Sequence, residues 1–348
     1  MSDRIRGQRW PQRWRVPAFL LSLVFFAAPA LCATSAPTDW DYRVRPGDNV
    51  WDLAGRYMKR EVPWQKLQDY NHIADPLHLP PGMTVHVPIA WLRVGPAQAR
   101  VVAVIGDAQA KLPEDGKNVA VVQGASFGYG AELTTGADAS LTLELADGSR
   151  VLMQSNSELA LDRLSEYGRT GMVDTRMRLK RGRVSSDVIP LSGSAARFTV
   201  STPNTISSVR GTHFRVVADD TQDVARTEVV SGHVDVGNDK RHVMVNGGRG
   251  VATTGTANPG QPEPLPDAPT IDCPREPVTQ LQAPVHWQPV PQAAHYRVQV
   301  ALSDRFEALL LDKVVDGTEA ALPLLPDGEH AVRVRAIAQD QLEGIDAV

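Results

Sequence analysis

Residues 140–153, SLTLELADGSRVLM, carry the pattern that decides the fold class of this chain. Leucine stands at every second position of the first half, which is the period of a strand with one buried face. Asp147-Gly148 is a turn dipeptide and the alternation resumes after it, so the stretch predicts a β-hairpin. The same pattern returns at residues 230–245 around an Asn-Asp turn. Repeated short strands of this kind predict an all-β domain over residues 98–255, and they leave sandwich, barrel and solenoid open.

Composition sets the class of protein. The chain has 348 residues, of which 42% are hydrophobic, enough to form the cores of several domains. The formal net charge is -4, so no overall positive field recruits nucleic acid. The two cysteines are Cys32 and Cys273, and we expect neither an intrachain disulfide nor a cysteine metal site. A Cys32–Cys273 disulfide would require that Cys32 is retained after export.

The first 33 residues have the pattern of a signal peptide. Five arginines precede an apolar run at residues 16–28, and small residues follow it. That run is shorter than the about 20 residues that span a bilayer, which favours cleavage over an uncleaved anchor. Elsewhere the sequence has no segment long and apolar enough to span a membrane, so we expect no transmembrane span after cleavage. The expected location is the periplasm or cell envelope of a Gram-negative bacterium.

The remainder of the chain divides into four parts by composition. Residues 40–91 carry helix-like spacing, residues 98–255 are strand and turn, and residues 256–280 are rich in proline. Strand patterns return from residue 281. We therefore predict a mainly β multidomain protein with this order: signal peptide 1–33, a small βααβ module 40–91, an all-β domain 98–255, a Pro-rich linker 256–280 and a β-sandwich-like segment 281–348.

The first module has the order strand, helix, helix, strand. Pro46-Gly47-Asp48 is a turn, and Asp48 or Asn49 can cap the helix that follows, because a side-chain oxygen accepts a free backbone N–H there. Three stretches, YRVRPGDNVWDLAGRYM, WQKLQDYN and LPPGMTVHVP, together resemble a LysM domain. The matching residues are Pro46, Gly47, Asp48, Leu53, Ala54, Asn71, Leu79, Pro81, Gly82, Val85, Val87 and Pro88. Asn49 and Trp51 depart from the most usual pattern.

The resemblance implies that this module binds the N-acetylglucosamine glycan of peptidoglycan. LysM domains hold the sugar in a shallow groove between the turn before the first helix and the loop before the second strand. Loops on rigid elements can offer both backbone hydrogen bonds and small apolar contacts. The alternative is a LysM fold that binds little glycan and serves as a spacer. The implied glycan-binding residues are Gly47, Asp48, Asn49, Val50, Ile73, Ala74, Asp75, Pro76 and Leu77.

The middle stretch carries a second resemblance. TPNTISSVRGTHFRVV, then TEVVSGHVDV, then NGGRGV follow in the order that is typical of a FecR-type domain. Named FecR proteins relay a signal through a cytoplasmic segment and a membrane anchor, which this sequence does not show. We therefore expect the β-rich fold without that signalling. The alternative function is an envelope sensor or regulatory protein whose FecR-like domain binds a protein partner.

Two basic features of the middle stretch have competing interpretations. Arg210-Gly211-Thr212 suggests an anion clamp, but a structural turn is favoured, in which Arg210 donates hydrogen bonds to turn carbonyls and Gly211 supplies an unusual backbone angle. Arg176, Arg178 and Lys180 share one face of a predicted strand. They could contact carboxylates of peptidoglycan peptides, or they could form a solvated strand face.

The last stretch resembles part of a fibronectin type III domain. Trp287 suits the buried tryptophan of an early strand, and Arg333, Val334, Arg335 and Ala336 suit a late one. A closing strand after residue 344 is not evident, so either the sequence is shortened or a partner completes the edge.

No catalytic constellation is present in the sequence. It contains no HExxH, GxSxG, P-loop or Cys–His pair, and no His spacing suits a metal. We expect no cofactor and no enzymatic activity, and an unrecognised β-fold glycan enzyme is the remote alternative. The sequence therefore predicts a non-catalytic envelope protein whose partners are peptidoglycan glycan strands and, through the FecR-like domain, another envelope protein.

Overall fold

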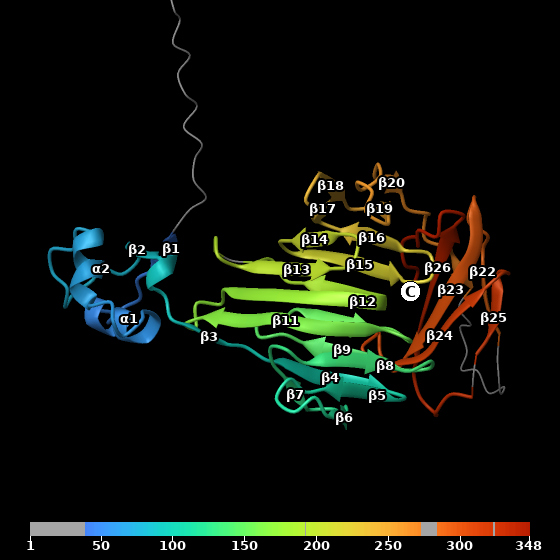
Figure 1. The fold of residues 1–348 in the computed structure, drawn as a ribbon, viewed down its shortest axis with the longest axis horizontal. Helices are drawn as coiled ribbons and strands as arrows, with labels where there is room; N and C mark the ends of the chain where they lie inside the picture. Colours follow the sequence, from blue (N-terminus) through green and yellow to red (C-terminus); the bar gives the residue numbers. More distant parts are fainter. Residues whose placement is uncertain (1–38, 192, 273–283, 323) are drawn as a thin grey trace, which may run out of the picture. The chain divides into compact units, whose positions relative to one another are not determined.

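The computed structural model describes residues 39–191, 193–272, 284–322 and 324–348 (Figure 1). The predicted signal peptide, Cys32 and Cys273 lie outside the described residues, so cleavage and the absence of a disulfide stay predictions. Strands make up 50% and helices 6% of the structure, in agreement with the predicted mainly β fold.

The amino-terminal module has two short strands and two short helices. Helix α1 begins after Asn49, because the Asn49 Oδ1 accepts the Asp52 N–H at 2.8 Å. Val50 and Leu53 lie on the buried face of α1. The predicted order strand, helix, helix, strand is confirmed. The elements are β1 (Asp39–Arg43), α1 (Val50–Tyr57), α2 (Trp64–Tyr70) and β2 (Thr84–Pro88), followed by a 3-10 turn, η1 (Ile89–Trp91).

The large β region follows directly. Its strands form one closed, barrel-like set of pairings, and between them lies a core in which Phe198 and Phe214 meet edge-on at 6.1 Å. The strands are β3 (Val94–Pro96), β4 (Ala99–Ile105), β5 (Ala108–Lys111), β6 (Asn118–Ala120), β7 (Ser126–Phe127), β8 (Glu132–Thr135), β9 (Ser140–Glu144), β10 (Arg150–Met153), β11 (Glu158–Tyr167), β12 (Val173–Val188), β13 (Arg197–Ser201), β14 (Ile206–Val209), β15 (Thr212–Asp219), β16 (Val224–Ser231), β17 (His233–Gly237), β18 (His242–Asn246), β19 (Arg249–Thr254) and β20 (Glu263–Pro264).

Strand β12 connects two series of pairings. Its first half pairs with β11 and, in parallel, with β13, whereas its second half pairs with β10 and β15. Gly182 stands where the strand changes partners, with φ +88, and a Cβ there would collide with Ser157. Only glycine suits both the backbone angle and this approach, so Gly182 allows one strand of 16 residues to serve both series.

The predicted hairpin is formed as expected. Strands β9 and β10 are antiparallel, with Leu143 opposite Val151. Gly148 between them has φ +89, which suits the Asp-Gly turn.

The Pro-rich stretch carries some packed structure. Strand β20 pairs with the first residues of β19, and Leu265 after it is buried. A Cβ on Gly250 would lie 2.9 Å from Leu265 Cδ2, so this segment lies close against β19. The stretch is therefore not a free spacer over its whole length, and its limits as a linker remain a prediction.

The carboxy-terminal segment is a sandwich of two three-stranded sheets. Trp287 is buried between them beside Tyr296, with ring centroids 5.5 Å apart. Residues beyond the last strand bridge back to it, at Ile337 with Glu343 and at Val334 with Ala347. Likeness to fibronectin type III remains a prediction. One sheet is β21 (Ile271–Asp272), β22 (Pro284–Trp287) and β25 (Glu319–Ala321); the other is β24 (Leu309–Val315), β23 (Ala293–Ala301) and β26 (Ala331–Ala338).

Candidate functional site

The two loops expected to bind glycan lie side by side. The Val50 N–H at the start of α1 donates to the Pro76 carbonyl oxygen at 2.9 Å. This bond joins the turn at residues 47–49 to the loop at residues 74–77. The sequence motif therefore brings both predicted segments together at one edge of the small module.

The first loop is held by its own carboxylate. Asp48 Oδ2 accepts the Tyr42 hydroxyl at 2.7 Å and the Arg45 N–H at 2.8 Å, and Gly47 has φ +88 at the turn. Burial, reinforced by the hydrogen bond to Asp48, raises the pKa of Tyr42 to about 12. The Asp48 side chain thus serves to fix the turn.

The second loop is ordered in the same way. Asp75 accepts the Leu77 N–H at 2.9 Å and contacts His78 Nδ1 at 2.9 Å. The backbone N–H of Leu77, followed by His78, lowers the pKa of the Asp75 carboxyl. Gln68 Nε2 donates to the Ile73 carbonyl at 3.0 Å and connects the loop to α2. Both loops are therefore preorganised by short local hydrogen bonds.

Exposure separates the nine predicted residues into two groups. Val50 and Ile73 are buried in the module core, at 0% and 8% exposure, so their side chains support the loops and do not reach a ligand. The others are exposed or half-buried, and Leu77 is 68% exposed. Among the described residues, the backbone N–H groups of Asn49, Ala74 and Asp75 have no acceptor within the chain. The edge thus presents free donors beside the apolar side chains of Ala74, Pro76 and Leu77.

Asn71 has a structural role in this edge. Its amide donates to the Leu67 carbonyl at 3.0 Å and to the His86 carbonyl at 2.8 Å, and its Oδ1 accepts the His86 N–H at 2.7 Å. The side chain therefore ties the end of α2 to β2 and holds the second loop in place.

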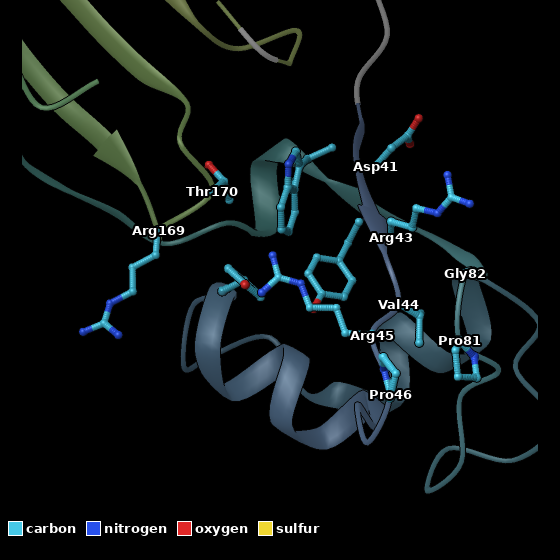
Figure 2. Close-up of a pocket in the computed structure, with 12 residues that line it drawn as sticks. Asp41, Arg43, Val44, Arg45, Pro46, Pro81, Gly82, Arg169 and Thr170 are labelled. Carbon is cyan, nitrogen blue, oxygen red and sulfur yellow. The ribbon is translucent and has the colours of Figure 1, made fainter. Parts of the chain in front are cut away.

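Two hollows lie against the small module, and sequence reasoning predicted neither. The first, of about 500 Å³, lies against β1 and next to Pro46. Figure 2 shows Arg43 and Arg169 extending away from one another on opposite sides of it, so these two charges do not converge on one point. The second, of about 640 Å³, runs along α1 and is lined by Trp51 and Trp64. Two features of the sequence could have indicated the second hollow: Trp51 in the first helical turn and the basic pair Lys59-Arg60.

The Arg-Gly-Thr motif of the middle domain is a structural turn. Gly211 has φ +91, and a Cβ there would lie 2.7 Å from Pro190 Cα. Thr212 Oγ1 donates to the His233 carbonyl at 3.0 Å, and Gly232 packs directly on Gly211. This motif and the Ser-Gly-His motif thus pack on one another, and the backbone angle of Gly211 is the one that the structural interpretation predicted. The hydrogen bonds predicted from Arg210 to turn carbonyls are not formed among the described residues. Arg210 is exposed.

The basic face of β12 is neutralised within the chain. Arg176 pairs with Asp174 at 2.9 Å, and Arg178 with Asp162 at 2.8 Å. Lys180 contacts two glutamates, Glu158 at 2.8 Å and Glu132 at 2.9 Å. Of the two interpretations, a strand face with internal partners fits better than a free anion site.

A buried ionic cluster that sequence reasoning missed lies beneath the last residues. Arg215 is fully buried, and its Nε donates to Glu228 Oε2 at 2.7 Å. Its Nη2 donates to the Glu343 carbonyl at 2.8 Å. Burial would raise the pKa of Glu343, but Arg183 and Arg297 hold it well below its usual range. The cluster fastens residues 343–346 to the middle domain.

The part of the chain that the structure describes shows neither a metal site nor a membrane-spanning helix. The described residues contain no group of three or more His, Cys, Asp or Glu side chains placed to bind a metal. Within those same residues, none of the helices has the length and apolar character needed to cross a membrane.

Comparison with known proteins locates two domains. Residues 42–88 match the LysM domain family, and residues 131–235 match the FecR protein family. LysM and FecR domains occur in envelope proteins, and both are typically binding or signalling domains without catalytic activity. A search of curated proteins finds no significant match.

Solved structures give a weaker likeness. Two crystal structures of a protein from Parabacteroides distasonis ATCC 8503, provisionally described as an anti-sigma factor, align at 15% and 14% identity. Their TM-scores are 0.33 and 0.32, and each alignment covers 38% of this chain and 59% of the other. This chain therefore spans less than two thirds of those structures. Along the chain, the match to the LysM domain at residues 42–88 is followed by the match to the FecR protein family at residues 131–235.

Proposed function

We propose that this protein is a non-catalytic, exported envelope protein that binds the N-acetylglucosamine glycan of peptidoglycan. The LysM domain anchors it, and the FecR domain is held near the wall as a result. Export rests on the amino-terminal sequence pattern, and the periplasm or cell envelope of a Gram-negative bacterium is the proposed location. The observation that carries the proposal is the pair of ordered LysM loops joined by the Val50–Pro76 hydrogen bond.

The chemistry of the loop edge suits an acetylated sugar. An acetamido carbonyl accepts hydrogen bonds from backbone N–H groups, and those of Asn49, Ala74 and Asp75 have no acceptor among the described residues. The methyl group and the sugar face pack on small apolar contacts, for which the exposed Leu77 is placed. Because both loops are already ordered, binding sacrifices little conformational entropy.

The test is a pull-down of the full chain on purified peptidoglycan with Leu77→Asp. Leu77 is exposed, so this change leaves the core intact and places a charge where the sugar would lie. Leu324, which is 72% exposed in the carboxy-terminal segment, provides the matched control Leu324→Asp. We expect Leu77→Asp to lose at least tenfold in affinity, or about 1.4 kcal/mol, and the control to bind as the wild type does. Equal retention of all three proteins would refute the site.

A second function is favoured by the FecR match. We infer that the FecR domain contacts another envelope protein through the outer face of β13, β14, β17 and β18. A hollow of about 270 Å³ lies on this face, and Met244 beside it is 53% exposed. Photo-crosslinking from residue 244 in intact cells tests this function, with residue 324 as the control position. A partner captured from both positions, or from neither, would count against it.

A further inference from the structure

The hollow along α1 is the strongest feature that the proposed function leaves unused. We call it the α1 groove. Its volume is about 640 Å³, and the residues that matter here are Trp51, Gly55, Lys59, Arg60, Trp64 and Arg93. We propose that the α1 groove binds the acidic peptide stem that peptidoglycan carries on its sugar chain. The inference rests on the proposed glycan function, because the sugar would bring the stem to the groove.

The floor of the groove is an open helix face. Trp51 and Gly55 are four residues apart on α1, so they lie on one face of the helix. A Cβ built on Gly55 would meet nothing within 4 Å, so the helix face is open at this position. Lys59 and Arg60 follow the end of α1 and line the far end of the same hollow. The groove therefore runs from an indole ring to two cations.

The cations of the groove are available to a ligand. Among the described residues, no acid forms an ion pair with Lys59 or Arg60. Asp52 is the only acid among the described residues that line the groove, and its carboxylate accepts the Asn49 amide at 2.7 Å. Arg93 Nη2 donates to the Gly55 and Met58 carbonyls, both at 3.1 Å, and adds positive charge at the end of α1. The groove thus attracts anions, although the whole chain has a net charge of -4.

The aromatic lining selects among anions. Trp51 is 66% exposed, and Trp64 is half-buried against the module core. An indole face packs well on methyl and methylene groups and on the edges of peptide units. The matching ligand therefore combines short apolar side chains with carboxylates, and a peptide of alanine and acidic residues has this chemistry. Inorganic phosphate or a simple polyanion would leave both indoles unused.

The distances suit a stem attached to a bound sugar. Helix α1 has eight residues, so it is about 12 Å long. It starts at Val50, beside the glycan loops, and ends next to Lys59. An extended peptide of four residues spans at most about 13–14 Å. A stem that leaves the sugar at the loops can therefore place its last carboxylate at Lys59 and Arg60.

The experiment titrates the full chain with two forms of one oligosaccharide, with and without its tetrapeptide stem. A charge-assisted contact at the end of the groove should make the stem-bearing form bind about tenfold more tightly. Lys59→Gln with Arg60→Gln should abolish this gain and leave the affinity for the stem-free form unchanged. Lys66→Gln with Arg241→Gln removes the same charge from exposed positions outside the groove, and this control should retain the gain.

A steric variant provides a second, independent measurement. Gly55→Leu fills the empty helix face, and leucine favours helix more than glycine does, so folding is retained. Gly55→Leu should remove the gain in affinity that the stem provides, while the stem-free oligosaccharide still binds.

Each result separates the two proposals. If the stem-free form binds and the stem adds nothing, the groove proposal is overturned while the glycan function stands. If neither form binds, the proposed function itself fails. If polyglutamate competes as well as the stem-bearing form, or if the control pair loses the gain equally, the effect is general electrostatics and the groove proposal is overturned.

Discussion

Strand β12 and the α1 groove are two basic surfaces with opposite surroundings. Arg178 on β12 is bidentate to Asp162, at 3.0 and 2.8 Å, and Lys180 lies between two glutamates. Lys59 and Arg60 at the α1 groove have no acidic partner among the described residues. A count of arginines and lysines in the sequence cannot distinguish these cases, because the difference lies in the residues that the fold brings alongside. Substitution of cations that have acidic partners should therefore change the free energy of unfolding, and substitution of cations without such partners should change the affinity for a ligand.

The largest effect is expected where an arginine is buried with its partner. Arg215→Leu removes the guanidinium between Glu228 and the Glu343 carbonyl and leaves Glu228 charged and unpaired in the interior. Loss of one member of a buried pair costs about 3–5 kcal/mol, so we expect the free energy of unfolding to fall by that amount. Urea denaturation measures it, with the exposed Arg210→Leu as a control expected within about 0.5 kcal/mol of wild type. Similar losses for both variants would contradict the distinction.

A pH dependence follows from Glu343 in the same cluster. Its folded-state pKa lies well below the ordinary value of 4.5, so its contribution to stability is complete above pH 4.5 and is lost as the pH falls. Glu343→Gln should lower the free energy of unfolding at pH 7 by about 1.5–3 kcal/mol, the range for hydrogen bonds to charged groups. The difference from wild type should narrow below about pH 4.5. Denaturation curves from pH 3 to 8 test this, and a difference that stays constant across that range would show that the carboxylate is not the group responsible.

The sequence predicted local turns and helix ends better than it predicted which distant residues come into contact. The Asp-Gly turn after Leu145 and a cap of α1 at Asp48 or Asn49 were predictable, because each depends on residues within one hairpin or helical turn, and the structure shows Asn49 as the cap. Alternation does not specify which strands pair, so the change of partners at Gly182 was not predictable. Arg215 and Glu343 are 128 residues apart, and no pattern of short period connects them.

The same reasoning applies to the candidate site. The two LysM loops were expected from their motif, and the hydrogen bond between Val50 and Pro76 joins them. Glycan binding by the nine predicted residues remains a prediction, as do the domain limits. The α1 groove was not predicted, because one wall comes from the end of α1 and another from Arg93, which lies 38 residues beyond Gly55. An exposed Trp51 was visible in the sequence only as a departure from the usual pattern.

A smaller effect is expected at the floor of the groove. Gly55→Ala replaces a helix-interior glycine at a position where a Cβ meets nothing within 4 Å. Alanine has the higher helix propensity, so the free energy of unfolding should rise by about 0.5–1 kcal/mol. Thermal denaturation monitored by circular dichroism measures this. A fall in the free energy of unfolding would mean that the helix face at Gly55 is occupied, and the inference of an open groove would then be wrong.

The smallest expected effect on stability is the one that distinguishes the two basic surfaces most sharply. Lys59→Gln with Arg60→Gln removes two cations that have no acidic partner, so nothing is left unpaired and the free energy of unfolding should change by less than about 0.5 kcal/mol. Arg178→Gln with Lys180→Gln leaves Asp162 and Glu132 without their cations and leaves Glu158 with Arg181 alone. This change should cost about 1 kcal/mol at low salt, reduced by screening at high salt because these side chains are partly exposed. The two double variants have the same net charge, so bulk electrostatics cannot separate them. The Lys59/Arg60 variant could instead lose more free energy of unfolding than the Arg178/Lys180 variant. Lys59 and Arg60 would then have a structural role, and no ligand would be needed to explain why they lie together beside two tryptophans.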